Sequence, residues 1–110
     1  MNIFRLQQLT AEHAAGGRRY LEFLRASSLS AGLYVLPVSA IDTQQPHTED
    51  EVYYVVQGRG MVQVASENRA IEPGTTIFVP ARVAHRFHTI TEELVLLVFF
   101  APAEGSRAAS

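Results

Sequence analysis

Residues 45–60 read QPHTEDEVYYVVQGRG, and this stretch decides the fold. Polar and acidic residues come first, and an apolar run rich in β-branched and aromatic residues follows over Val52 to Val56. Such a run, bounded by turn-forming residues, is typical of a strand that is covered on both faces. We predict a strand over residues 51–57, a tight turn at Gly58-Arg59-Gly60 and a returning strand over residues 61–64.

The rest of the chain alternates short apolar segments with turn signals, as all-β proteins do. A short helical turn capped by Thr10 is expected over residues 10–15, and Glu72-Pro73-Gly74 predicts a type II turn. The pattern predicts an all-β sandwich or barrel in a single domain, residues 1–110, with the barrel over about 18–102 and a flexible segment over 103–110. Further strands are expected over residues 20–24, 29–37, 75–79, 84–90 and 94–100.

Composition excludes several classes of protein. The chain has no cysteine and no lysine, which excludes disulfides, thiolate metal sites and lysine Schiff-base chemistry. A net charge of −2 without a basic run argues against nucleic-acid binding. No apolar run is long enough to span a membrane, and the first residues lack the layout of a signal peptide, so we expect a cytoplasmic protein.

Three side chains form the candidate site. His47 and Glu51 precede or begin the predicted strand, and His85 ends the stretch GTTIFVPARVAH, residues 74–85. Residues at even spacing share a face of a strand, so these side chains can meet inside a barrel. Two imidazoles and one carboxylate bind a divalent metal and leave coordination positions open. Gln45 has the same parity and is a weaker fourth candidate, with water as the alternative.

These two stretches resemble the paired motifs of the cupin family. His47, Glu51 and Gly58 match the second histidine, the glutamate and the glycine of the first motif, and Gly74, Pro80 and His85 match the second motif. The resemblance extends from about Leu33 to Pro102 and implies a small double-stranded β-helix, the cupin or jelly-roll barrel. Three positions depart from the family pattern: Gln45 replaces a histidine, Arg82 a glycine and Thr89 a frequent asparagine.

Strand alternation also predicts a substrate pocket. It turns Tyr53 inward beside the ligands and places Phe87 and Thr89 on the same face as His85, while His88 faces away. We expect an apolar pocket shaped by Tyr53, Phe87 and Phe99, with Thr89 as its polar group.

Several functions remain open at this point. The triad suits Fe(II) and oxygen chemistry, which makes a dioxygenase acting on a small molecule the first hypothesis. The bound ion is expected to be iron, zinc, manganese or nickel. The resemblance also allows a metal-dependent isomerase, and a non-catalytic module that binds or senses a small molecule. Apolar residues on both faces of the strands predict a homodimer.

Overall fold

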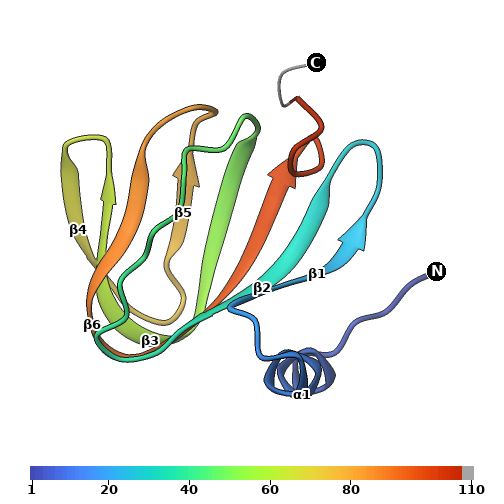
Figure 1. Ribbon diagram of the computed structural model, residues 1–110, viewed down its shortest axis with the longest axis horizontal. Helices are drawn as coiled ribbons and strands as arrows, with labels where there is room; N and C mark the ends of the chain where they lie inside the picture. Colours follow the sequence, from blue (N-terminus) through green and yellow to red (C-terminus); the bar gives the residue numbers. More distant parts are fainter. Residues whose placement is uncertain (108–110) are drawn as a thin grey trace.

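The computed structural model describes residues 1–107, which form one helix and one antiparallel sheet (Figure 1). The strand order is β1-β2-β6-β3-β4, and β5 pairs with β3 outside this path. The prediction of an all-β fold with a short N-terminal helix is confirmed. The elements are α1 (Leu6–Gly16), β1 (Tyr20–Arg25), β2 (Ser30–Leu36), β3 (Asp50–Val64), β4 (Glu67–Ile71), β5 (Thr76–Val79) and β6 (His85–Ala101).

Strand β3 runs through Gly58-Arg59-Gly60 without turning back, so the predicted hairpin at this place is wrong. The register between β3 and β6 shifts three times between Val55 and Met61, which bends the strand instead of reversing it. Gly58 has a φ of +100°, and a Cβ there would lie 2.1 Å from the carbonyl oxygen of Glu93. The glycine therefore allows two long strands to bend together at close range. The reversal occurs later, between β3 and β4, where Val64 pairs with Glu67.

Strand β6 contains an irregularity at Thr89, which has a φ of +49°. Before it, His85 and Phe87 are buried; after it, Ile90, Leu94, Leu96, Val98 and Phe100 belong to the inward cluster, while Val95 is buried on the outward face against α1. The irregularity thus exchanges the two faces of the strand partway along its length.

Replacement of Thr89 by asparagine is expected to raise the free energy of unfolding by about 1 kcal/mol, because asparagine tolerates a left-handed backbone and a β-branched residue does not. Urea denaturation measures this change. Thr91→Asn is the control: Thr91 is equally exposed and is not among the residues with a positive φ, so that variant should gain nothing. Equal midpoints for the two variants would show that the backbone at Thr89 carries no strain.

Two clusters of apolar side chains hold the sheet. The larger one lies on the inward face and includes Tyr53, Phe87 and Leu96, all at 0% exposure. The smaller one lies on the other face, where Leu9 of α1 packs with Leu33 and Val95. Figure 1 shows α1 against the β1–β2 side of the sheet, in agreement with its contacts. Within residues 1–107, no helix is long and apolar enough to cross a membrane.

The helix begins earlier than predicted. It starts at Leu6, and no side chain in the described part of the chain caps it. Thr10 lies inside it, and its hydroxyl donates to the carbonyl of Leu6, so the predicted cap at Thr10 is wrong.

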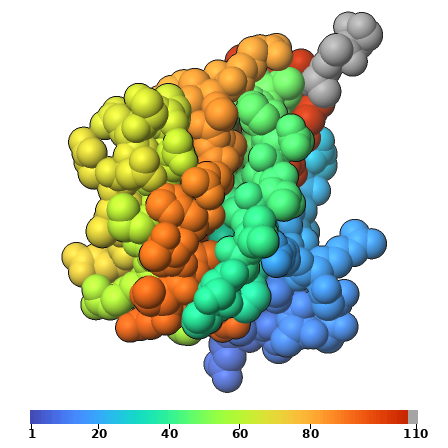
Figure 2. Space-filling view, turned by 60° about the vertical axis from the view of Figure 1, so that its left-hand side comes forward, coloured from blue at the N-terminus to red at the C-terminus, as the bar shows by residue number. Residues whose placement is uncertain are grey.

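Two irregular segments border the inward face. Residues 37–49 run beside the first part of β6, as Figure 2 shows in teal and green against orange, and Ser39 donates its N–H to the carbonyl of Ile90. The second segment follows β6. We predicted a flexible stretch over 103–110, but residues 103–107 are held against the sheet: Ala103 is 3% exposed, and the carboxylate of Glu49 accepts the N–H groups of Gly105 and Arg107. Residues 108–110 lie outside the described residues.

Candidate metal centre and pocket

The three predicted ligands come from separate segments that the sheet brings together. Glu51 lies near the start of β3, where it pairs with Val79 of β5 and with Phe100 of β6. His85 is the first residue of β6, and His47 lies in the connection just before β3. One donor atom from each side chain lies within 4.8 Å of the other two.

The carboxylate of Glu51 lies between the two imidazoles. Its Oε1 is 3.2 Å from Nδ1 of His47 and 3.1 Å from Nε2 of His85. The Glu51 side chain is 1% exposed, and that of His85 is 0% exposed. His85 donates from Nδ1 to the carbonyl of Val83 at 3.0 Å, so its Nε2 is the nitrogen that points to the carboxylate.

Unpaired polar atoms mark this cluster as a place for a cation. Within residues 1–107, both carboxylate oxygens of Glu51 and Nδ1 of His47 are buried and make no hydrogen bond of regular geometry, and Oε1 is left with only the two imidazole contacts. A buried carboxylate without hydrogen bonds is costly unless a positive charge compensates it. The donor set, two imidazole nitrogens and one carboxylate, matches the preferences of zinc and of the divalent transition metals. The residues therefore fit a divalent metal.

In the absence of metal, the carboxylates of the cluster set the protonation of its two histidines. Burial by itself would lower the pKa of His47, but the carboxylates of Glu104 and Glu51 outweigh it and raise this pKa to about 9. Burial would also lower the pKa of His85, yet Glu51 and the carbonyl of Val83 raise it. Conversely, burial would raise the pKa of Glu51, and its contacts with His47, His85 and Tyr53 lower it. In the metal-free protein, protons on the imidazoles balance the carboxylate.

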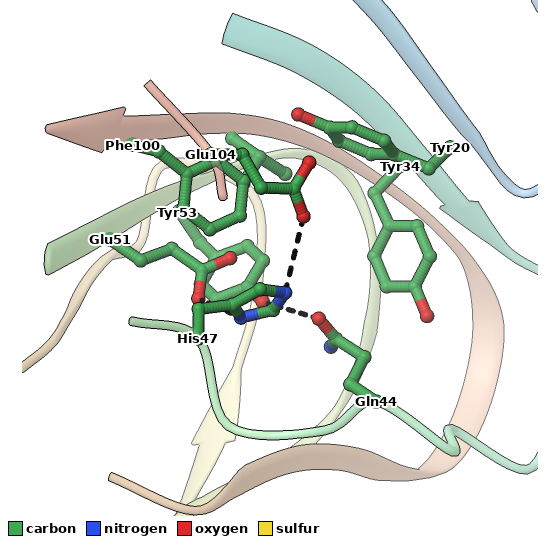
Figure 3. A pocket seen from close by; sticks show the side chains of 9 residues that line it. Tyr20, Tyr34, Gln44, His47, Glu51, Tyr53, Phe100 and Glu104 are labelled. Atoms are coloured by element: carbon green, nitrogen blue, oxygen red, sulfur yellow. Dashed lines mark hydrogen bonds and ion pairs between the residues drawn. The ribbon is translucent and has the colours of Figure 1, made fainter. Parts of the chain in front are cut away.

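A pocket of about 190 Å³ opens beside His47 and Glu51 (Figure 3). Its wall combines apolar carbon surface, largely from aromatic rings, with a few polar groups, and Tyr53 lines it as predicted. The hydroxyl of Tyr53 donates to the Gln44 amide oxygen at 3.0 Å and lies 3.1 Å from Nε2 of His85. Burial raises the pKa of Tyr53 well above its usual value, so this group is a neutral hydroxyl. The lining residues are Tyr20, Tyr34, Gln44, His47, Glu51, Tyr53, Val98, Phe100 and Glu104.

The other predicted pocket residues lie at different places. Phe87 is fully buried in the core and packs edge-on against Tyr53, with ring centroids 4.9 Å apart, so it supports the wall from behind. Phe99 is 38% exposed on the outward face, and its neighbour Phe100 lines the pocket instead. Thr89 is exposed beside His88. The predictions for Phe99 and Thr89 assumed that side chains alternate without interruption along β6. The irregularity at Thr89 ends this alternation, so neither side chain reaches the pocket.

Gln45 is exposed and Gln44 faces the pocket in its place. The reason is local: the carboxylate of Asp42, which also accepts the N–H of Phe87, binds the amide nitrogen of Gln44 at 2.9 Å. This contact orients the Gln44 side chain, and strict alternation does not apply in an irregular connection.

Several pocket residues escaped the sequence analysis. Tyr20 and Tyr34 are direct partners in the β1–β2 ladder, and both rings reach the pocket. The Tyr20 ring lies across Gly32, where an added Cβ would lie 2.2 Å from its hydroxyl oxygen. That hydroxyl is buried and has no partner within residues 1–107. Two tyrosines on neighbouring strands beside a strand glycine were the sequence signal that could have predicted this part of the pocket. No such signal marked Glu104, which lies in the predicted flexible stretch.

Comparisons with known proteins agree with this architecture. The model of the family described as "Cupin domain" matches residues 32–100. Protein SCO3923 of Streptomyces coelicolor is 48% identical over 105 residues, which cover 96% of this chain and 100% of that protein. The solved structure of an RmlC-like cupin from Shewanella frigidimarina has a TM-score of 0.70 at 25% identity, over 76% of this chain and 75% of its own. A structure of DMSP lyases has a TM-score of 0.64 at 27% identity, over 69% of this chain and 40% of its own.

Proposed function

Because the chain belongs to the cupin domain family, we propose that it binds one divalent metal through His47, Glu51 and His85 and acts on a small oxygen-bearing molecule in the adjacent pocket. The observation that carries this proposal is the buried Glu51 carboxylate, whose Oε1 lies 3.2 Å from Nδ1 of His47 and 3.1 Å from Nε2 of His85, beside a pocket that Glu51 and His47 line. A bound divalent ion would supply electrophilic activation of a substrate oxygen.

The side chains around the metal ligands support binding of a small polar substrate. The volume of about 190 Å³ is below the range of drug-sized ligand pockets, which favours a small molecule. Burial raises the pKa of Tyr20, so its unpartnered hydroxyl is available to donate to a substrate oxygen. The Gln44 amide, held by Asp42, adds a second fixed polar group on the opposite side.

This inventory favours proton-transfer chemistry, of the isomerase or lyase type, over oxygen chemistry. Electrophilic activation by a metal makes the carbon next to a carbonyl more acidic, and hydroxyl donors stabilise the charge that develops on the oxygen. The likeness to a structure of DMSP lyases supports the same direction. The dioxygenase remains the second candidate, since two histidines and one carboxylate leave positions for both substrate and O₂.

The test compares metal-loaded and metal-free protein on a panel of small 2-hydroxy and 2-oxo acids in deuterated water. Proton-transfer chemistry predicts deuterium incorporation, seen by NMR, with at least one metal-loaded sample and none with the metal-free protein. Oxygen consumption without exchange would favour the dioxygenase. Saturable binding without either reaction would assign the non-catalytic role.

We also propose a homodimer in which the outward face of the sheet is covered. Cross-strand pairing aligns Phe99 of β6, Val52 of β3 and Phe78 of β5 in one row, and Phe78 is 58% exposed. An exposed apolar row of this kind is typical of a subunit interface. Light scattering at micromolar concentration should give twice the chain mass of 12.1 kDa, and Phe78→Glu should reduce it to one chain. A single-chain mass for the wild type would refute the dimer.

A further inference from the structure

We propose that Glu104, which lies just after β6, positions His47 for metal binding, and that buried Glu49 holds Glu104 in place. The inference rests on the metal site proposed above. It assigns a role to residues 102–107, here called the Glu104 turn, that neither cupin motif contains.

The two ring nitrogens of His47 face different carboxylates. Nδ1 lies 3.2 Å from Oε1 of Glu51, and Nε2 lies 3.4 Å from Oε2 of Glu104 (Figure 3). Of these two nitrogens, Nδ1 is the buried atom without a hydrogen-bond partner among the described residues. The Glu104 carboxylate thus takes the outer side of the ring, and Nδ1 points toward the other two ligands.

The two histidines of the site are held in comparable ways. The carbonyl of Val83 accepts from Nδ1 of His85 and leaves Nε2 toward Glu51. For His47, the Glu104 carboxylate contacts the second ring nitrogen, as the Val83 carbonyl does for His85. A metal-bound histidine commonly gives its second nitrogen to a carboxylate or a carbonyl, which fixes the ring and raises its basicity. His47 depends more on such a contact, because its side chain is 20% exposed and that of His85 is fully buried.

The Glu104 turn is fixed by hydrogen bonds to two strands, β1 and β2, and to the connection that precedes β3. The N–H of Glu104 donates to Oγ of Ser30 at 2.9 Å, and its carbonyl accepts from Arg25 at 2.7 Å. The two carboxylate oxygens of Glu49 accept the N–H groups of Gly105 and Arg107, each at 2.8 Å.

The anchor is part of the segment that carries the ligands. Glu49 is 1% exposed and lies two residues after His47 and two before Glu51. A buried carboxylate with two backbone donors is a rigid attachment. The segment that carries two metal ligands therefore also carries the anchor for the residue that orients one of them.

The experiment is a cobalt(II) titration of the full chain, followed by its visible absorption and by calorimetry. Glu104→Ala should weaken cobalt affinity by about 10- to 100-fold, the usual cost of losing such a contact. One cobalt per chain should still bind at saturation, and the thermal unfolding midpoint of the metal-free protein should stay near that of the wild type. Glu104→Gln keeps an oxygen acceptor without the charge, so its loss of cobalt affinity should be smaller than that of Glu104→Ala. Glu93→Gln, a charge-matched change at an exposed position of β6, should change nothing.

The anchor is tested by a double-mutant cycle. Glu49→Gln releases the turn and should weaken cobalt binding, and the double variant with Glu104→Ala should bind no worse than Glu104→Ala alone. Additive losses would contradict the link between Glu49 and Glu104. Wild-type affinity and an unchanged cobalt spectrum in Glu104→Ala would overturn the positioning role while leaving the metal site intact. Failure of the wild-type protein to bind cobalt would overturn both the metal site and this inference.

Discussion

Replacement of His85 by alanine should lower the affinity for a divalent metal by more than 100-fold. Losing a residue that only supports a metal ligand costs up to about 100-fold, and losing a ligand itself should cost more. The reason is that Nε2 of His85 is one of the three donor atoms of the site, and the variant leaves only two of them. Elemental analysis after dialysis against a stated metal concentration measures the effect. His47→Ala should give the same result, because its Nδ1 faces the same Glu51 oxygen.

His88→Ala is the matched control for this experiment. His88 lies on the same strand, three residues after His85, and its ring contacts Thr89 and Asn68 outside the pocket. It should retain the wild-type metal content. Undiminished metal in both His85→Ala and His47→Ala, with circular dichroism unchanged, would show that the ion binds elsewhere.

Replacement of Gly58 by alanine should lower the free energy of unfolding by about 3 kcal/mol or more. Its φ of +100° excludes an ordinary side chain, and the added Cβ would lie 2.1 Å from the carbonyl oxygen of Glu93 and 2.8 Å from the Cα of Leu94. Both obstacles are backbone atoms, so relief requires β3 and β6 to separate where they bend. A loss of this size is a large part of the 5–15 kcal/mol that stabilises a typical domain. Urea denaturation, or the soluble yield if the variant does not fold, measures it.

Gly16→Ala separates this effect from a general cost of removing a glycine. Gly16 ends α1, has no positive φ and has open space around its Cβ position. Alanine there should be neutral or stabilise by up to about 1 kcal/mol, since alanine favours helix more than glycine. Comparable losses in the two variants would contradict the close approach of β3 and β6.

The class of the fold and the three candidate ligands were predictable because short stretches of the sequence point to them. Apolar runs between turn signals indicated the strands, and the family resemblance is confirmed by the domain match over residues 32–100. His47 and Glu51 are only four residues apart in the sequence. His85 pairs with Val64 at the far end of β3, so its approach to Glu51 also depends on the curvature of the sheet, which the sequence did not reveal.

The pocket was harder to predict because two backbone irregularities break the alternation of side chains. The bend at Gly58 was mistaken for a hairpin, since glycines around a polar residue signal both. The positive φ at Thr89 exchanged the faces of β6, so Phe100 and not Phe99 reaches the pocket. From Leu94 to Phe100 both faces of this strand are apolar, and that part of the sequence therefore carried no polar alternation that would have revealed the change.

The family departures at Arg82 and Thr89 have a common structural basis. Both residues have a positive φ, 67° at Arg82 and 49° at Thr89. The family's usual glycine and its frequent asparagine suit that conformation. The departures therefore affect backbone strain. The third departure, at Gln45, concerns the ligands: Gln45 is exposed, and Gln44 lines the pocket.

Glu104 and Glu49 illustrate contacts that no local pattern reveals. Their link joins residues more than 50 positions apart and runs through backbone N–H groups, which every residue except proline has. Small and polar residues after the last strand predicted a mobile segment, and nothing in them indicated the hydrogen bonds that Gly105 and Arg107 donate to the carboxylate of Glu49.

The central claim is that His47, Glu51 and His85 hold one divalent metal, and anomalous diffraction from crystals grown with zinc or manganese tests it most directly. The account predicts a single strong peak within about 2.0–2.3 Å of a nitrogen of His47, a nitrogen of His85 and an oxygen of Glu51. An ordered triad without a peak, in crystals whose metal content is established by fluorescence, would contradict the account.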